Sequence, residues 1–170
     1  MEVFYQTLET PIGKLLVASS FRGICRIGFP SEAASDQAAW FHRHFSVVPE
    51  ESVEGFLARA MEQLNQYFEG QEKAFDVPLD LRGTPFQIRV WQKLLEIPYG
   101  ATVSYGGVAR AIGNPQASQA VGAAVGKNPV PIVVPCHRVI GYNGSLVGFG
   151  GGLPTKEKLL KLEGVPVGEQ

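Results

Sequence analysis

The tightest restriction on the fold comes from two short helices that the sequence predicts on either side of Gly113-Asn114. Ser104 can cap the first helix, and Gly113 ends it. Asn114-Pro115 begins the second helix, which runs to Gly126. Two short helices joined by so tight a turn are typical of a helix-turn-helix. The second half of the chain is therefore expected to be mainly helical.

The outward face of the second helix is small and almost uncharged. The face expected to pack on the core holds Ala117, Ala120, Val121, Ala124 and Val125. The outward face holds Ser118, Gln119, Gly122, Ala123 and Gly126. Glycine in a helix costs about 1 kcal/mol relative to alanine, and a solvated face normally carries Glu or Lys. The pattern indicates that a bulky surface approaches this backbone closely, and tight packing inside the protein is an equal alternative.

The distribution of charge suggests what that bulky surface is. The 170 residues carry a net charge of −1. Residues 1–83 contain 7 Lys and Arg against 12 Asp and Glu, a net of −5, whereas residues 84–170 contain 8 against 4, a net of +4. This split favours a polyanion bound by the second half only, although chance produces such a split as readily. A reader of the DNA major groove would show several Arg, Asn or Gln on the outward face. Only Gln119 and Gln116 qualify, which favours recognition of shape or of a narrow groove.

The remaining patterns complete a two-domain prediction. Residues 3–29 read as a hairpin with a further turn, residues 33–45 and 53–68 as helices, and residues 77–79 as a short strand. In the second half we expect a helix that begins at Thr84-Pro85, a buried strand at 132–134, a short strand at 139–140 with a loop after it, and a last helix at 155–162. The expected fold is an α/β N-terminal domain (1–80) with a small antiparallel sheet, followed by a mainly α, winged helix-turn-helix-like domain (84–170).

Several classes of protein are disfavoured by composition. No apolar run approaches the roughly 18 residues that a membrane span needs, and the first ten residues do not resemble a signal peptide. The two cysteines, Cys25 and Cys136, lie far apart in different contexts. We therefore expect no membrane association, no disulfide and a cytoplasmic location.

The motif Pro135-Cys136-His137-Arg138-Val139 carries the chemistry. A thiolate is the reactive form of cysteine, and neighbouring positive charge lowers the pKa of a cysteine. Neighbours on a strand point to opposite faces, so His137 would need a bend or a bridging water to act on Cys136. Taken alone, the motif fits a buried, inert cysteine beside a buried histidine better than a reactive pair.

The wider context reverses that balance. The stretch from Asn128 to Ile140 resembles the active-site segment of the O6-alkylguanine-DNA alkyltransferases. The resemblance covers about residues 84–164 and includes Ser104-Tyr105, Gly113-Asn114-Pro115, Ala120-Val121-Gly122, Gly151-Gly152-Leu153 and Glu163-Gly164. The first half matches only loosely, through residues 10–14. The resemblance implies direct-reversal DNA repair without a cofactor, by a monomer that binds double-stranded DNA in the minor groove. O6-alkylguanine, and O4-alkylthymine as well, would be flipped out of the duplex and would give the alkyl group irreversibly to Cys136.

The resemblance also implies a role for each matching residue. Cys136 would be the alkyl acceptor, His137 its base through a water, and Glu163 the group that orients His137. Asn128 would stabilise the turn before the active-site strand, and Tyr105 would donate a proton to ring nitrogen N3 of guanine. Without the resemblance, Tyr105 reads as a core tyrosine and Glu163 as a solvated helix-end charge.

Further residues would contact substrate or DNA. The backbone at Cys136 and Val139 would accept hydrogen bonds from the guanine amine, and the Gly150 N–H would meet the guanine oxygen. Phosphate contacts are expected from Arg110, Lys127 and Arg138, with a structural role as the alternative for Arg138. The other expected contacts are Ser118, Gln119, Ala120, Gly122 and Phe149.

Three departures from the family pattern are visible. Gln119 stands where family members often have an arginine that fills the gap left by the flipped base, and Phe149-Gly150 stands where relatives can have Tyr and Ser. No metal site is expected in the first half, because Cys25 is its only cysteine and His42 and His44, at i and i+2, do not share a helix face.

Three alternatives remain at this stage. A non-catalytic sensor of alkyl lesions would lack the acceptor cysteine, and Cys136 argues against it. A winged-helix regulator would need base-reading side chains and usually a dimer interface. A cysteine hydrolase that turns over would need an oxyanion hole and a Cys and His that are separated in sequence.

Overall fold

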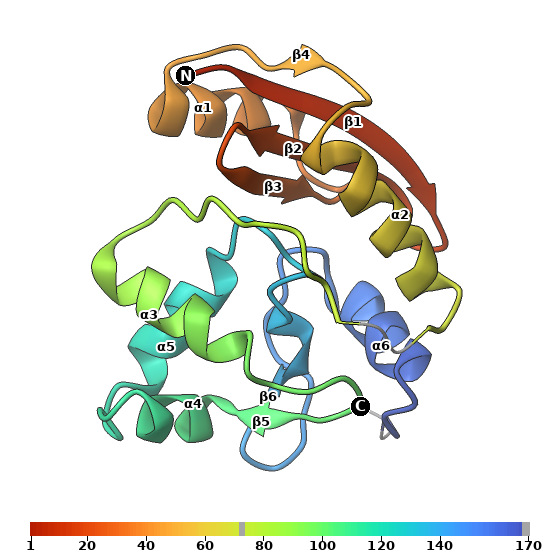
Figure 1. Cartoon of the computed structure of the whole chain (residues 1–170). Coiled ribbons are helices and arrows are strands. Elements are labelled where there is room, and N and C mark those ends of the chain that lie inside the picture. The colour runs from red at the N-terminus through yellow and green to blue at the C-terminus, as the bar shows by residue number, and fades with distance from the viewer. Residues whose placement is uncertain (72–73, 168–170) are drawn as a thin grey trace. The chain divides into compact units, whose positions relative to one another are not determined.

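The computed structural model describes residues 1–71 and 74–167. Two compact units make up the chain, Met1–Arg82 and Gly83–Gln170, and Figure 1 shows their elements. The first is an α/β unit and the second is mainly helical, which confirms the predicted fold class.

The first unit is built on a long hairpin. Strands β1 (Val3–Thr10) and β2 (Gly13–Ser20) pair antiparallel along their full length, and β3 (Gly23–Gly28) pairs antiparallel with β2. The two-residue strand β4 (Glu50–Glu51) pairs parallel with β1, giving the order β3-β2-β1-β4. The predicted small antiparallel sheet corresponds to β1, β2 and β3, and the parallel strand β4, which was not predicted, makes the sheet mixed at this edge. Two residues are too few to show a period of two in the sequence.

Two helices bury apolar faces in this unit. Helix α1 (Ala34–Phe45) contributes Phe41 and Phe45 to a core cluster with Val3, Ala18 and Cys25. Helix α2 (Phe56–Phe68) contacts the hairpin and β3, and its buried residues are Leu57, Ala60, Leu64 and Tyr67. Burial raises the pKa of the Cys25 thiol to about 12, so this thiol is unreactive. The predicted strand at 77–79 is only a single bridge from Leu79 to Ile24, because Pro78 has no N–H for a ladder.

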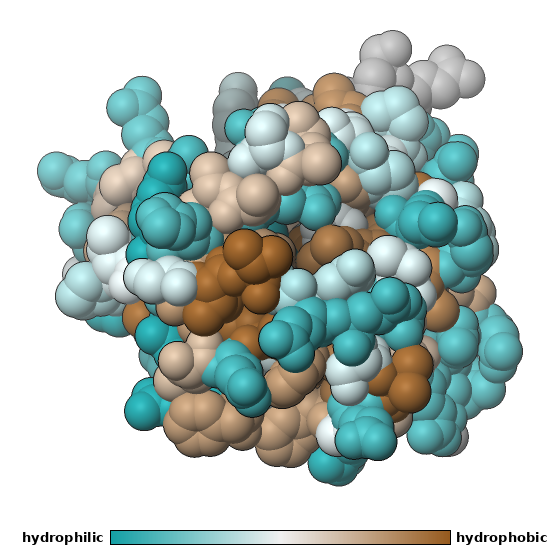
Figure 2. All heavy atoms as spheres, turned by 90° about the horizontal axis from the view of Figure 1, so that it is seen from above, coloured by the Kyte–Doolittle hydropathy of each residue, from teal (hydrophilic) through white to brown (hydrophobic). Residues whose placement is uncertain are grey.

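Apolar side chains on the surface are scattered. Figure 2 shows one face of the molecule, on which hydrophobic residues lie among hydrophilic ones. The most exposed large apolar side chains of the first unit are Val48, Phe21 and Val53, at 88%, 69% and 67%. Single exposed apolar residues are usual on protein surfaces. No helix in the described ranges is both long enough and apolar enough to span a bilayer.

The second unit begins with a helix whose start the sequence predicts correctly. Helix α3 (Pro85–Leu94) has a reciprocal cap: the Thr84 hydroxyl accepts a hydrogen bond from the Gln87 N–H at 3.1 Å, and the Gln87 side chain accepts one from the Thr84 N–H at 2.9 Å. Strand β5 (Val103–Ser104) leads into helix α4 (Tyr105–Ala111). The Ser104 hydroxyl caps α4 by accepting from the Gly107 N–H at 2.9 Å.

Helix α5 (Ser118–Gly126) follows the predicted turn but starts later than expected. Gly113 has a left-handed φ of 82°, and the N–H of Ala117 donates to the carbonyl of Asn114 at 3.0 Å. Residues 114–117 thus form a turn of their own, and Asn114-Pro115 does not begin the helix. Ala120, predicted to be in the core, is exposed. The two helices α4 and α5 pack on each other and on α3.

The apolar stretch before Cys136 is buried but is not a strand. Pro129, Pro131 and Pro135 have no N–H to donate to a ladder, and Ile132 has a left-handed φ of 76°. Cys136–Arg138 then forms a single 3-10 turn, η1. The strand expected at 132–134 is therefore wrong, because proline overrides the β propensity of the valines around it.

The last elements close the second unit. Strand β6 (Val139–Ile140) pairs parallel with β5, and helix α6 (Leu153–Leu162) begins two residues before its predicted start. The β5–β6 pairing brings the segment after Cys136 beside the beginning of α4.

Trp91 anchors α5 to α3 through a buried hydrogen bond from its indole Nε1 to the Ala124 carbonyl at 2.8 Å. We expect Trp91→Phe to lower the free energy of unfolding by about 2 kcal/mol, because one buried hydrogen bond is lost and a gap remains. Urea denaturation measures this change. Gln92→Ala, on the exposed side of the same helix, is the matched control and should change stability by less than about 0.5 kcal/mol. Equal stability of the Trp91→Phe protein and the wild type would show that this contact does not hold the two helices together.

Candidate active site

Cys136 lies in η1 with 5% of its surface exposed. Its N–H donates to the Val134 carbonyl at 2.8 Å. Burial raises the pKa of the Cys136 thiol to about 11, and the Asn128 side chain, the positive charge of Lys156 and the backbone N–H groups of Cys136 and His137 act in the opposite direction. The thiol is thus protonated at rest, with neighbours that favour the thiolate.

Asn128 links the end of α5 to the turn that carries Cys136. Its Nδ2 donates to the Val134 carbonyl at 2.8 Å, and its Oδ1 accepts from the Val130 N–H at 3.0 Å. The structure thus places Asn128 at the turn where the resemblance puts it, and its side chain there also lowers the pKa of the Cys136 thiol.

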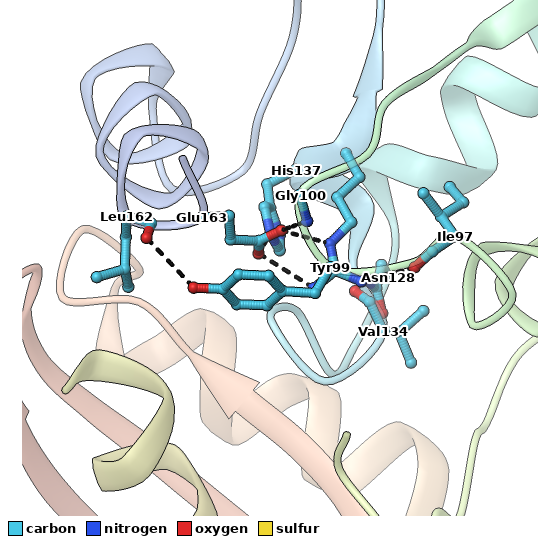
Figure 3. A network of polar contacts seen from close by, with 9 residues as sticks. Ile97, Tyr99, Gly100, Asn128, Val134, His137, Leu162 and Glu163 are labelled. Atoms are coloured by element: carbon cyan, nitrogen blue, oxygen red, sulfur yellow. Dashed lines mark hydrogen bonds and ion pairs between the residues drawn. The ribbon is translucent and has the colours of Figure 1, made fainter. Parts of the chain in front are cut away.

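His137 and Glu163 form a buried pair. The distance from His137 Nε2 to Glu163 Oε2 is 2.5 Å, and both side chains are fully buried. Oε1 of Glu163 also accepts a hydrogen bond from the Gly100 N–H at 3.0 Å. Figure 3 shows these groups converging on the carboxylate. Burial opposes ionisation of Glu163, but the hydrogen bonds from His137 and Arg138 lower its pKa to about 2.

The state of His137 follows from its burial. Burial lowers the pKa of His137, Glu163 raises it, and Arg138 and Lys156 lower it further. A neutral imidazole whose Nε2 donates to Glu163 is the arrangement that leaves Nδ1 as the basic nitrogen. Cys136 and His137 are in a 3-10 turn and not in a strand, so their side chains do not have to point to opposite faces.

Lys156 is a functional candidate that the sequence prediction missed. Its side chain is completely buried. Its Nζ donates to the Val139 carbonyl at 2.6 Å and to the Val147 carbonyl at 3.0 Å. Burial lowers the pKa of Lys156 to about 8, whereas the nearby Cys136 acts to raise it. Helical spacing could have found this lysine, since it precedes the buried Leu159 and Leu160 by three and four residues on one face.

Tyr105 stands at the first position of α4, half-buried. Its hydroxyl donates to the Val147 carbonyl at 3.1 Å, and Lys156 Nζ lies 5.9 Å from the centre of its ring. Burial raises the pKa of Tyr105, and so does the charge of Cys136. A Cβ built on Gly122 would lie 3.8 Å from the Tyr105 ring. A Cβ at this distance makes an ordinary van der Waals contact, so the Tyr105 ring leaves room for alanine at position 122 and restricts only larger side chains.

The expected DNA contacts divide into exposed and buried residues. Gln119, Ala120, Arg110 and Lys127 are exposed, and Ser118 and Gly122 are partly buried. Arg138, in contrast, is 8% exposed and is bonded to Glu163. This placement favours the structural alternative for Arg138 over a phosphate contact.

The loop after β6 holds the remaining expected contacts. Val139 is buried, and its carbonyl already accepts from Lys156; a carbonyl has two lone pairs, so a further donor is compatible with this bond. Phe149 is partly buried, and its carbonyl accepts from the Gly152 N–H at 2.9 Å. Gly150 is exposed, with open space where a Cβ would lie.

Taken together, the site joins a nucleophile to acid–base groups. The turn η1 supplies the thiol and the imidazole, and the residue after α6 supplies the carboxylate that orients the imidazole. Helix α4 supplies the phenol, and α6 supplies the ammonium. Within residues 1–71 and 74–167, no three or more His, Cys, Asp or Glu side chains cluster in a way that could hold a metal ion. The described groups can thus support nucleophilic attack coupled to proton transfer.

Comparison with known proteins gives consistent matches over both units. Residues 3–81 match the family described as 6-O-methylguanine DNA methyltransferase, ribonuclease-like domain. Residues 85–165 match 6-O-methylguanine DNA methyltransferase, DNA binding domain. A methylated-DNA–protein-cysteine methyltransferase of Methanosarcina acetivorans is 46% identical over 164 residues, which are 95% of this chain and 99% of the relative. The constitutive one of Bacillus subtilis is 42% identical over 168 residues, 98% and 99% of the two chains.

Solved structures agree with these matches. The O6-methylguanine methyltransferase of Mycobacterium tuberculosis superposes with a TM-score of 0.82 at 44% identity, covering 95% of this chain and 92% of that one. The same TM-score and identity are found for the M. tuberculosis protein in complex with DNA, with 94% and 92% covered.

The charge of Lys156 should be measurable at Cys136. We expect Lys156→Met to slow the reaction of Cys136 with iodoacetamide at pH 8 by about 3- to 10-fold, because a nearby cation favours the thiolate. Quantifying the modified Cys136 peptide by mass spectrometry follows this one thiol. Lys158→Met, an exposed lysine on the same helix, is the matched control and should react like the wild type. Equal rates for Lys156→Met and Lys158→Met would contradict the electrostatic coupling.

Proposed function

This chain belongs to the 6-O-methylguanine DNA methyltransferase family, and we propose that Cys136 is the cysteine to which it transfers the methyl group of O6-methylguanine in DNA. The observation that carries the proposal is the position of Cys136 next to the buried His137–Glu163 pair. Cys25, the other cysteine, has no such partners and lies in the core of the first unit.

The proposed step transfers one alkyl group and two protons. Sγ of Cys136 attacks the alkyl carbon, an S–C bond forms, and the bond from that carbon to guanine O6 breaks. The thiol proton passes through a water to Nδ1 of His137, which becomes an imidazolium held by Glu163. The electron pair of the broken bond goes to the guanine, and the Tyr105 hydroxyl donates a proton to guanine N3. The thioether is not hydrolysed, so each molecule reacts once.

The pKa of about 11 at Cys136 suits such a protein. A thiol that is protonated at rest does not react with adventitious electrophiles, since the thiolate is the nucleophile. When substrate fills the site, removal of the proton by His137 and the charge of Lys156 would together favour the thiolate.

The second unit would also bind the DNA. Because the target atom lies inside the duplex, the base has to be rotated out of the stack. We propose that α5 docks in the minor groove of double-stranded DNA, where its small outward residues allow close approach. Arg110 and Lys127, exposed at the ends of α4 and α5, would contact phosphates. O4-alkylthymine would be a second substrate.

The first unit would be structural, and the protein would act as a monomer. The acceptor has to remain a reduced thiol, and Cys25 and Cys136 are both free cysteines. A reducing compartment, the cytoplasm, meets that requirement. Compared with the lesion sensor, the regulator and the hydrolase considered from sequence, this function alone uses both Cys136 and the DNA-binding helices.

Cys136→Ala should abolish alkyl transfer and leave DNA binding nearly intact, because binding comes from α5 and the basic surface. Intact-mass spectrometry after incubation with an O6-methylguanine duplex measures transfer, and a gel-shift titration measures binding. The wild type should gain one methyl mass, and Cys25→Ser should do the same. Transfer that persists in Cys136→Ala, with methyl on Cys25, would overturn the assignment.

Gln119 is the long side chain on the outward face of α5, and we propose that it enters the base stack at the lesion. An inserted side chain offsets part of the few kcal/mol that unstacking a base costs. Gln119→Arg should therefore speed transfer from duplex DNA, and Gln119→Ala should slow it, with little effect of either on a free O6-alkylguanine base. The measurement is the ratio of duplex to free-base transfer rates for the three proteins. One common ratio would mean that residue 119 is not inserted and that the docking of α5 is wrong.

A further inference from the structure

Arg138 is held by three hydrogen bonds in the interior of the second unit. Its Nε donates to Glu163 Oε1 at 2.8 Å and its Nη2 to Glu163 Oε2 at 3.1 Å. Its Nη1 donates to the Ile97 carbonyl at 2.7 Å. The guanidinium also lies 5.8 Å from the centre of the Tyr99 ring. The Tyr99 hydroxyl donates to the Leu162 carbonyl, next to Glu163 (Figure 3).

The carboxylate of Glu163 is therefore shared between two basic side chains. Oε2 accepts from both His137 and Arg138, and Oε1 accepts from Arg138 and the Gly100 N–H. A histidine paired with a carboxylate alone gains affinity for a proton, since the negative charge favours the imidazolium. Here the guanidinium, which is always charged, already balances that negative charge.

We infer that Arg138 is a positioning residue of the proposed transfer reaction: by binding Glu163 through a two-pronged contact, it lets the carboxylate orient His137 while His137 stays neutral and able to accept the Cys136 proton. This inference rests on the proposed function only in what the neutral His137 is for, namely accepting the Cys136 proton. The contacts themselves belong to the folded protein without DNA.

The charges around His137 support this reading. Glu163 faces His137 from the residue after α6, Arg138 from η1 and Lys156 from α6. Protonation of His137 would place a third positive charge near those of Arg138 and Lys156, with Glu163 as the one nearby anion. If Arg138 lost its charge, only Lys156 would oppose the imidazolium. The negative charge of Glu163 would then be shared with no guanidinium and would favour protonation of His137.

The geometry also explains why the residue is arginine. Its planar fork spans both carboxylate oxygens and still has a nitrogen to donate to Ile97. A lysine could carry the charge but offers one donor atom in place of three. A phosphate contact would require Arg138 to leave Glu163, and the cost of leaving a buried carboxylate unpaired is high.

The test is a histidine titration in the protein without DNA. The chain has three histidines, so the Cε1–H region of an NMR spectrum contains three resonances, and His42→Gln and His44→Gln variants identify that of His137. In Arg138→Met we expect the titration midpoint of His137 to rise by about 1 pH unit or more, in the range that a single nearby charge produces. The rise should vanish in Arg138→Met/Glu163→Gln, because the carboxylate causes it.

Two controls separate charge from structure. Arg89→Met removes an exposed arginine of the same unit and should leave the midpoint unchanged. Arg138→Lys keeps the charge and should show little or no rise. If Arg138→Met does not fold, Arg138→Gln carries the same expectation. A His137 midpoint that stays the same or falls in the folded, uncharged variant overturns the inference.

The rate of alkyl transfer gives an independent readout. A higher His137 pKa means that His137 is already protonated at a higher pH, so the acid limb of the pH–rate profile should move to higher pH in Arg138→Met. A merely structural role would lower the rate equally at each pH. If the NMR midpoint rises and the acid limb stays in place, the inference about Arg138 stands and the role of His137 as base in the proposed function fails.

Discussion

The second unit depends on one buried carboxylate. Glu163 lies directly after α6, yet it binds the loop after α3 through Gly100 and the 3-10 turn through His137 and Arg138. A buried charge is tolerated only when it is paired and hydrogen-bonded. The fold meets this condition by bringing three segments that are far apart in sequence to the Glu163 carboxylate, which also binds the proposed base His137. The same contacts that stabilise the unit therefore orient the base.

A second constraint acts on the Cys136 thiol. Burial keeps Cys136 protonated, while Asn128 and Lys156 favour the thiolate. Asn128 also fixes the turn that carries Cys136, and Lys156 also binds the two carbonyls of Val139 and Val147. Tyr105 donates to that same Val147 carbonyl. The loop after β6 thus helps to hold the Lys156 ammonium that lowers the pKa of the thiol, and it binds the Tyr105 phenol at the same carbonyl.

How much of this could be predicted from sequence depends on the range of the interaction. Local chemistry was sufficient for the helix start at Thr84-Pro85 and for the turn at Gly113, because both are decided within a few residues. Local reading was wrong at 132–134, where valines suggest a strand and the flanking prolines prevent one. It also missed Lys156 and left the role of Arg138 open between a phosphate contact and a structural one. A lysine or arginine is solvated by default, and only the folded chain brings the carbonyls of Val139 and Val147, or the carboxylate of Glu163, to these two side chains.

The small residues of α5 show how one pattern can have two causes. From sequence, close approach of DNA and packing inside the protein were equal explanations. The structure assigns them to different positions. A Cβ on Gly122 would make an ordinary contact with the Tyr105 ring, so the protein interior admits alanine there and restricts only larger side chains. A Cβ on Gly126 would meet nothing within 4 Å, and Ala123 is exposed, so interior packing does not limit these two positions. Helix propensity does not favour glycine either. A small residue at 126 is thus compatible with the proposed close approach of DNA to α5, and interior packing does not require it.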